Sequence, residues 1–293
     1  MARLSIQKTY KIFIGGQFPR TESGRFYPVY NSGKELLANM CLSSRKDFRN
    51  AVVAARKAFG GWSSKSAFNR GQILYRIAEM MEGRKHQFIA EIMSQGSTQK
   101  QAEQEVQTAI DRCVYYCGWC DKYQQLFSAV NPVASAHFNF SVPEPTGVVS
   151  IIAPENTSLL GLVSVILPVI AGGNVCVVLA SESKPLCSIT LAEVLATSDL
   201  PGGVVNVLTG QLKELHTHMA SHMDVNAVVY ARENRTEIKA MAELCSLNVK
   251  RFFHWNHDWK LSSSENPYLI LDLQEIKTTW HPIEKIGASG SGY

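Results

Sequence analysis

The fold is decided by residues 145–156, which read Pro145-Thr-Gly-Val-Val-Ser-Ile-Ile-Ala-Pro-Glu-Asn156. Residues 148–153 are apolar and rich in Val and Ile, and an apolar segment of helical length follows at 158–171. A strand that is apolar on both faces and leads into a helix is typical of a parallel sheet covered by helices. The stretch therefore predicts the opening strand of an α/β unit.

The same unit of strand, turn and helix is repeated downstream. We expect five strands, at residues 148–153, 175–179, 204–208, 227–230 and 249–253, and connecting helices at 158–171, 186–198, 212–221 and 236–246. Gly172-Gly173 and Pro201-Gly202-Gly203 break the pattern between units. Residues 146–260 are thus predicted to form a five-stranded parallel sheet of the Rossmann type.

Residues 1–145 are predicted to form a separate layer of strands and helices. Here β-prone runs at 11–15 and 24–30 predict an opening pair of strands, and a later strand is expected at 137–142. Ser44 and Asp47 predict a capping box for a helix that ends at Gly60-Gly61. Apolar periodicity predicts two further helices, at 70–93 and 99–127.

Within residues 261–293 we expect no further domain. They contain a polar linker, a strand-like run at 267–280 and a Gly/Ser-rich tail at 287–293. The composition of the tail predicts a flexible segment.

Composition and charge exclude several classes of protein. The chain has 293 residues, 45% of them hydrophobic and 18% charged, which is typical of a globular protein. Its net charge of +4 is spread along the predicted helices, so nucleic acid is not expected as a partner. The longest apolar stretch, 159–173, is shorter than the roughly 20 residues that cross a bilayer, so no membrane span is expected. Seven scattered cysteines and a polar N-terminal segment favour a reducing, cytoplasmic setting.

Several motifs resemble those of aldehyde dehydrogenases and occur in the order that family has. Residues 145–156 resemble the family's first strand and its Pro-Trp-Asn turn, and further matches lie at residues 10–18, 54–62, 115–119, 167–174, 200–210 and 221–225. Residues 274–280 resemble the closing strand that takes part in subunit assembly. The resemblance implies the N-terminal layer and cofactor sheet of that fold without its catalytic domain. The pattern of losses is similar to the second, degenerate unit of aldehyde dehydrogenase family 16.

The resemblance also implies which catalytic groups are present and which are missing. The family oxidises aldehydes with a cysteine thiolate, an oxyanion hole, NAD(P) and a glutamate base. Asn156 matches the amide donor of the oxyanion hole, although an asparagine in such a turn could instead cap the following helix. Trp255 stands where the base is expected, with His254 or His257 as a stand-in. The nucleophile should lie beyond the fifth strand, but the last cysteine is Cys245, and only residues 260–266 are available where the catalytic domain would be.

The cofactor contacts implied by the resemblance are also incomplete. Remnants are expected at Ile152, Ala153, Glu155 and Glu182, of which Glu182 matches an acceptor for the adenosine ribose. The lysine expected beside it is Leu179. Where the family has Phe-Thr-Gly-Ser, this chain has Tyr230-Ala-Arg-Glu-Asn-Arg235, so Glu233 places an anion where a phosphate would approach a helix N-terminus. Arg232 and Arg235 could compensate for that charge. We therefore expect no tight cofactor and at most weak NAD(P) binding.

Two other clusters could hold a metal. Cys113, Cys117 and Cys120 have the spacing of a cysteine set for an iron-sulfur cluster, but within a helix they would form one buried stripe. The second cluster, His216, His218 and His222, has a spacing that can hold zinc, but a solvated helix end explains it as well. We expect no metal at the histidines.

Three hypotheses for function follow. The first is a noncatalytic scaffold or regulatory module that forms a homo-oligomer or joins an aldehyde dehydrogenase relative, since a missing catalytic domain should leave apolar surface exposed. The second is an NAD(P)-dependent oxidoreductase whose missing thiol and base come from another chain. The third is an iron-sulfur protein that uses Cys113, Cys117 and Cys120.

Overall fold

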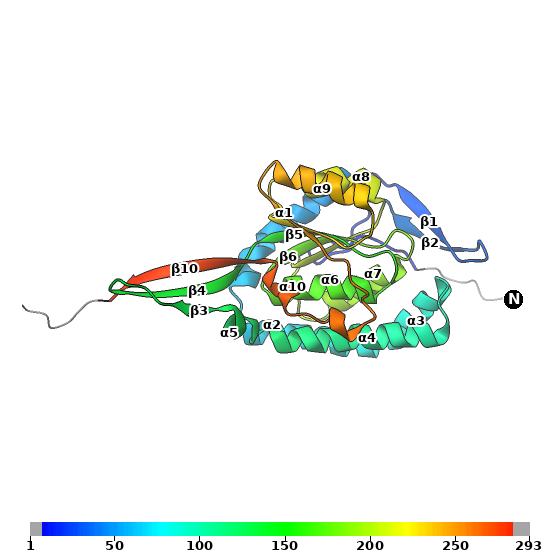
Figure 1. The fold of residues 1–293 in the computed structure, drawn as a ribbon. Coiled ribbons are helices and arrows are strands. Elements are labelled where there is room, and N and C mark those ends of the chain that lie inside the picture. The colour runs from blue at the N-terminus through cyan, green and yellow to red at the C-terminus, as the bar shows by residue number, and fades with distance from the viewer. Residues whose placement is uncertain (1–7, 284–293) are drawn as a thin grey trace, which may run out of the picture.

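A five-stranded parallel sheet forms the centre of the computed structural model, which describes residues 8–283 (Figure 1). Its strand order is β7-β6-β5-β8-β9. The strands are β5 (Val148–Ile152), β6 (Val175–Leu179), β7 (Val205–Leu208), β8 (Ala227–Tyr230) and β9 (Arg251–His254). This confirms the predicted sheet, and the strand order reverses between β5 and β8. In open α/β sheets, ligands bind at the carboxyl ends of the strands beside such a reversal.

Helices cover both faces of the sheet (Figure 1). One face carries α1 (Arg45–Ser63), α8 (Leu212–Ser221) and α9 (Arg235–Ser246), and the other carries α6 (Leu160–Ala171) and α7 (Leu186–Ala196). Every residue of α6 is buried, because this helix lies between the sheet and a further layer of helices. The apolar run of the sequence is therefore a core helix, as predicted. Among residues 8–283, no helix is both long and apolar enough to cross a membrane.

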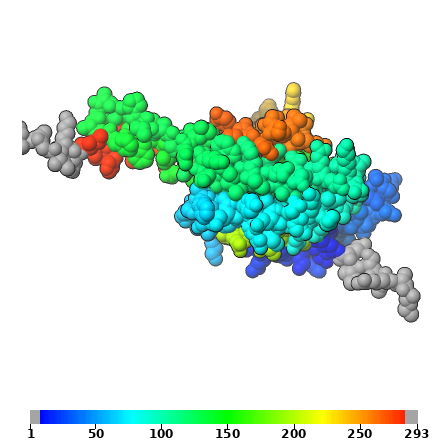
Figure 2. Space-filling view, turned by 90° about the horizontal axis from the view of Figure 1, so that it is seen from below, coloured from blue at the N-terminus to red at the C-terminus, as the bar shows by residue number. Residues whose placement is uncertain are grey.

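The outer helices differ from the prediction in their bounds. The capping box of Ser44 and Asp47 is confirmed, although α1 continues past Gly60-Gly61 to Ser63. The helix expected at 70–93 is two helices that meet at Arg84, and the one expected at 99–127 ends early and is followed by a short helix. The elements are α2 (Ala67–Gly83), α3 (Lys85–Ser94), α4 (Gln99–Trp119) and α5 (Tyr123–Phe127). Helices α2–α4 form one continuous outer face (Figure 2).

Of the predicted opening pair of strands, at 11–15 and 24–30, only the second is a strand in the structure. Instead, β1 (Phe26–Tyr30) pairs with β2 (Leu36–Cys41), a strand that was not predicted. Residues 11–15 form no named strand, and Phe13 makes an isolated antiparallel bridge with Val207 on the edge strand β7. Pairing with a distant edge, which local sequence does not reveal, accounts for the difference.

A thin arm of three antiparallel strands projects from the body (Figures 1 and 2). Its strand order is β10-β4-β3, with β3 (Ala129–Asn131), β4 (His137–Pro145) and β10 (Gln274–Pro282). The closing strand predicted at 274–280 is confirmed as β10, whereas the longer strand-like run at 267–280 is a strand only from Gln274, since Tyr268–Leu271 is the short helix α10. The tail predicted at 287–293 lies outside the described residues.

Residues 255–273, here called the strap, connect β9 to β10 where the family's catalytic domain was expected. The strap buries five apolar side chains, none more than 4% exposed: Trp255, Trp259, Leu269, Ile270 and Leu273. The surface predicted to be exposed by the missing domain is therefore partly covered by the chain itself. Large apolar side chains remain exposed elsewhere, among them Met223, Leu247 and Val249.

One arginine of α4 holds the strap in place. The side chain of Arg112 is fully buried. It donates from Nη1 to Ser164 Oγ at 2.9 Å and from Nη2 to the Trp259 carbonyl at 3.1 Å. Its Nε lies 3.4 Å from a carboxylate oxygen of Glu265. Arg112 therefore joins α4, α6 and the strap.

Candidate functional site

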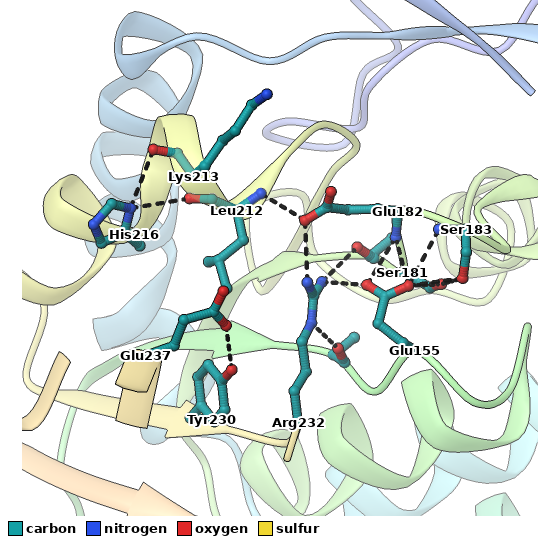
Figure 3. A network of polar contacts seen from close by, with 12 residues as sticks. Glu155, Ser181, Glu182, Ser183, Leu212, Lys213, His216, Tyr230, Arg232 and Glu237 are labelled. Carbon is teal, nitrogen blue, oxygen red and sulfur yellow. Dashed lines mark hydrogen bonds and ion pairs between the residues drawn. The ribbon is translucent and has the colours of Figure 1, made fainter. Parts of the chain in front are cut away.

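The candidate site lies at the carboxyl edge of the sheet, beside the strand-order reversal. Ile152 ends β5 and Ala153 follows it, and because both are buried they set the position of the Pro154-Glu155-Asn156 turn. The turn after β6 places Ser181, Glu182 and Ser183 opposite it, and Arg232 follows β8 (Figure 3). We call Glu155, Ser181, Glu182, Ser183 and Arg232 the edge cluster.

Glu155 is held by the turn that follows β6. Its carboxylate accepts hydrogen bonds from the Ser181 hydroxyl at 2.7 Å, the Glu182 amide at 2.9 Å and the Ser183 hydroxyl at 2.8 Å. Burial by itself would raise the pKa of Glu155, but the Arg232 guanidinium and these donors outweigh it and leave the pKa below its usual value. Glu155 is therefore a fixed anion of the cluster.

Arg232 fills the space between the strand ends. Its Nη2 lies 2.7 Å from Glu155 Oε1, and its Nη1 lies 3.1 Å from Glu182 Oε1. Its Nε donates to the Ala153 carbonyl at 3.0 Å. Figure 3 shows the guanidinium between these acceptors. The side chain is only 11% exposed. The charge of the guanidinium is thus neutralised by carboxylates of the protein. Arg232 is therefore not free to contact a phosphate or to compensate for the charge of Glu233, which the sequence had left open.

Glu182 serves as a helix cap. Its Oε1 accepts the Leu212 amide at 2.7 Å, at the start of α8, where the N-cap residue Gln211 makes no side-chain cap bond. A carboxylate is favoured at a helix N-terminus by the free amides and by the helix dipole. Glu182, which was expected to accept a hydrogen bond from a ribose hydroxyl, therefore already binds the start of α8 and Arg232 through the same carboxylate oxygen.

A cavity of about 430 Å³ lies next to the edge cluster. Its lining includes Asn156, Trp259 and three glutamates, namely Glu155, Glu233 and Glu237. These carboxylates disfavour the pyrophosphate of a dinucleotide, and Arg232 is already paired with Glu155 and Glu182. Of the two predicted cofactor contacts at the end of β5, Ile152 and Ala153, the Ala153 carbonyl already accepts a hydrogen bond from Arg232.

Asn156 lies in the turn after β5, at the edge of the cavity. Its side chain is exposed and lines the cavity, and its amide has no hydrogen-bond partner among the described residues. The alternative reading, that Asn156 caps the following helix, is wrong. Glu105 of α4 caps α6 instead, since its Oε1 accepts the amides of Ser158 at 2.9 Å and Leu159 at 2.7 Å. The sequence carries no signal for this cap, because Glu105 lies on a different helix.

Among the described residues, no cysteine lines the cavity beside Asn156. Trp255, at the position of the expected base, is buried and donates from Nε1 to Asp272 at 2.9 Å, so it has a structural role. His257 lines the cavity, and burial lowers its pKa, whereas His254 bonds the Arg232 carbonyl. None of the seven cysteines lines the cavity. The arrangement offers an amide donor and an imidazole but no thiol.

The two alternative clusters do not form metal sites. Within the described part of the chain, no group of three or more His, Cys, Asp or Glu side chains could hold a metal ion. Cys113 and Cys120 are buried in the helical layer, and burial raises the pKa of both thiols. These findings do not support the iron-sulfur alternative.

The chain matches the family model described as the aldehyde dehydrogenase family over residues 18–254. It is 30% identical to mouse cytosolic 10-formyltetrahydrofolate dehydrogenase over 85% of this chain and 28% of that protein. It is 31% identical to omega-crystallin of Nototodarus sloanii over 83% of this chain and 50% of that protein. The chain therefore belongs to the aldehyde dehydrogenase family, and it spans about half or less of the length of these relatives.

Solved structures agree with this assignment. The NAD complex of aldehyde dehydrogenase from Bacillus cereus superposes with a TM-score of 0.80 at 25% identity, over 84% of this chain and 50% of that one. HpcC from Thermus thermophilus gives a TM-score of 0.80 at 27% identity, over 84% of this chain and 48% of that one. The predicted fold class is confirmed. The likeness to the second unit of family 16 stays a prediction.

Proposed function

We propose that this chain is a noncatalytic member of the family that acts as a scaffold or regulatory module within a cytosolic assembly. One observation carries the proposal: no cysteine lines the cavity beside Asn156. The short strap, which connects β9 directly to β10 at the point in the chain where the catalytic domain was expected, supports it. Aldehyde oxidation by the family's route requires a sulfur nucleophile. The mouse relative is a cytosolic 10-formyltetrahydrofolate dehydrogenase, which supports a cytosolic location for this chain.

The arm supports assembly with a second chain. A narrow sheet with both faces in solvent has little stability of its own, and its outer strands have unpaired edges. Large side chains of the arm are exposed, including Val130 at 68%, Ile276 at 52% and Trp280 at 57%. A second copy of this chain or an aldehyde dehydrogenase relative would cover them.

Light scattering of the purified chain at micromolar concentration tests the assembly. We expect a dimer or larger species, and we expect the double variant Ile276→Asp/Trp280→Asp to reduce the mass. Met223→Asp, at an exposed apolar residue outside the arm, is the matched control. A stable monomer of the unaltered chain would contradict the scaffold proposal. Reduction of NAD or NADP with an aldehyde by the chain alone would contradict its noncatalytic part.

A second candidate is an oxidoreductase completed by a partner that supplies the thiol and the base. The unpartnered amide of Asn156 at the cavity favours it. Mixing the chain with a catalytically intact relative should then raise aldehyde turnover, and Asn156→Ala should remove the increase, because the amide would stabilise the oxyanion. Turnover equal to that of the relative alone would rule this candidate out.

A further inference from the structure

The ends of three strands converge on one guanidinium. Besides Glu155, Glu182 and the Ala153 carbonyl, Arg232 approaches the Ala180 carbonyl, with Nη2 at 3.4 Å. These four acceptors follow β5 and β6, whereas Arg232 follows β8. A planar guanidinium with donors in fixed directions matches such an arrangement of carboxylates and carbonyls.

We propose that Arg232 is an internal ligand, whose guanidinium occupies a planar-cation slot at the carboxyl edge of the sheet and keeps a dinucleotide out of it. The slot consists of the carbonyls of Ala153 and Ala180 and the carboxylates of Glu155 and Glu182. This inference goes beyond the scaffold proposal, since it assigns a binding slot and the chemical class of its ligand.

The slot is held in shape by groups other than Arg232. Four donors from residues 181–183 fix the carboxylate of Glu155, and the Leu212 amide fixes that of Glu182. The two carbonyls belong to backbone at the ends of buried strands. Shortening the arginine should therefore leave a preformed site with two anions and two further acceptors.

The charge of this region rejects a dinucleotide. Glu233 and Glu237 line the neighbouring cavity together with Glu155. Lys184 is a nearby cation, with Nζ 3.3 Å from the Asn156 carbonyl. Arg232 is already paired with Glu155 and Glu182, so the two carboxylates of Glu233 and Glu237 face this single lysine. A pyrophosphate would be repelled, whereas a small cation would be attracted.

Chemical rescue tests the slot. Arg232→Ala should lower the Tm by on the order of 5–10 °C, because it leaves paired carboxylates without their cation. Methylguanidinium at millimolar concentration should restore at least half of that loss, while tetramethylammonium, which cannot donate hydrogen bonds, should not. Arg235→Ala is the matched control, since Arg235 is exposed and forms no ion pair among the described residues. It should show neither the loss nor the rescue.

A second measurement covers the case in which Arg232→Ala does not fold. Equilibrium dialysis of the unaltered chain against NAD should show no saturable binding at millimolar concentration. Saturable NAD binding, or a folded Arg232→Ala variant that methylguanidinium does not stabilise, would overturn the proposal. Neither readout measures turnover or oligomer mass, so failure here is distinguishable from failure of the scaffold proposal.

Discussion

Replacing Arg112 with methionine should loosen the strap and destabilise the fold. Methionine keeps most of the apolar stem but removes the charged hydrogen bonds to Ser164 Oγ at 2.9 Å and to the Trp259 carbonyl at 3.1 Å. Hydrogen bonds to a charged group contribute about 1.5–3 kcal/mol each, so two give about 3–6 kcal/mol. Removing a buried charge also relieves its desolvation, which places the expected loss near the lower end, at about 3 kcal/mol.

Urea unfolding followed by tryptophan fluorescence measures this loss, and two tryptophans of the strap, Trp255 and Trp259, report on it directly. Trypsin cleavage after Lys260, which is exposed in the strap, should become faster. Arg76→Met is the control, because Arg76 is 47% exposed and its pairing with Glu79 contributes about 0.5 kcal/mol or less. A loss under about 1 kcal/mol in Arg112→Met, with unchanged cleavage after Lys260, would refute the role given to this arginine.

Three further outcomes are expected. Glu105→Gln should destabilise the start of α6 by about 0.5–2 kcal/mol, as loss of a helix cap does, and hydrogen exchange should quicken at residues 158–160. Because the pKa of Glu155 is lowered in the folded chain, the stability from this group is present above the ordinary carboxyl value of about 4.3 and is lost as the pH falls through the lowered pKa. Glu155→Gln should therefore be less stable at pH 7 and show a shallower acid loss in urea titrations. Cys117 is the one cysteine that is not buried, so a thiol reagent should modify one thiol in the native chain and the others after unfolding.

The controls for these three use the same chain. Glu103→Gln, on the same helix as Glu105, should leave exchange at residues 158–160 unchanged. For Glu155, an acid profile that matches the unaltered chain would contradict the assigned pKa direction. Cys117→Ser should abolish the native thiol reaction, and burial, which raises the pKa of Cys117, should make that reaction faster at alkaline pH. Rapid native modification of several thiols would contradict the burial of the other six cysteines.

Local sequence was sufficient to predict the parallel sheet. Strands buried on both faces must be apolar along their whole length, so runs such as 148–153 and 175–179 revealed the parallel sheet. The sequence also shows directly that no cysteine follows Cys245 in residues 246–293, which is the basis for expecting no thiol nucleophile. Element bounds were less accurate: the break at Arg84 and the strand β2 depend on packing against distant segments, which periodicity does not record.

The roles of individual polar residues depended on tertiary contacts. The sequence predicted separate roles for Glu155, as a remnant cofactor contact, and for Arg232, as a cation that could compensate for Glu233. The fold instead places Arg232 Nη2 2.7 Å from Glu155 Oε1. Glu105 and Arg112 carried no motif and were not singled out, although they hold α6 and the strap. A hydrogen-bond partner is chosen by distance and direction in space, whereas sequence patterns report only neighbours along the chain and the face that an element buries. The hydrophobic pattern of the sequence therefore predicted the fold, whereas tertiary packing determined which charged side chains contact one another.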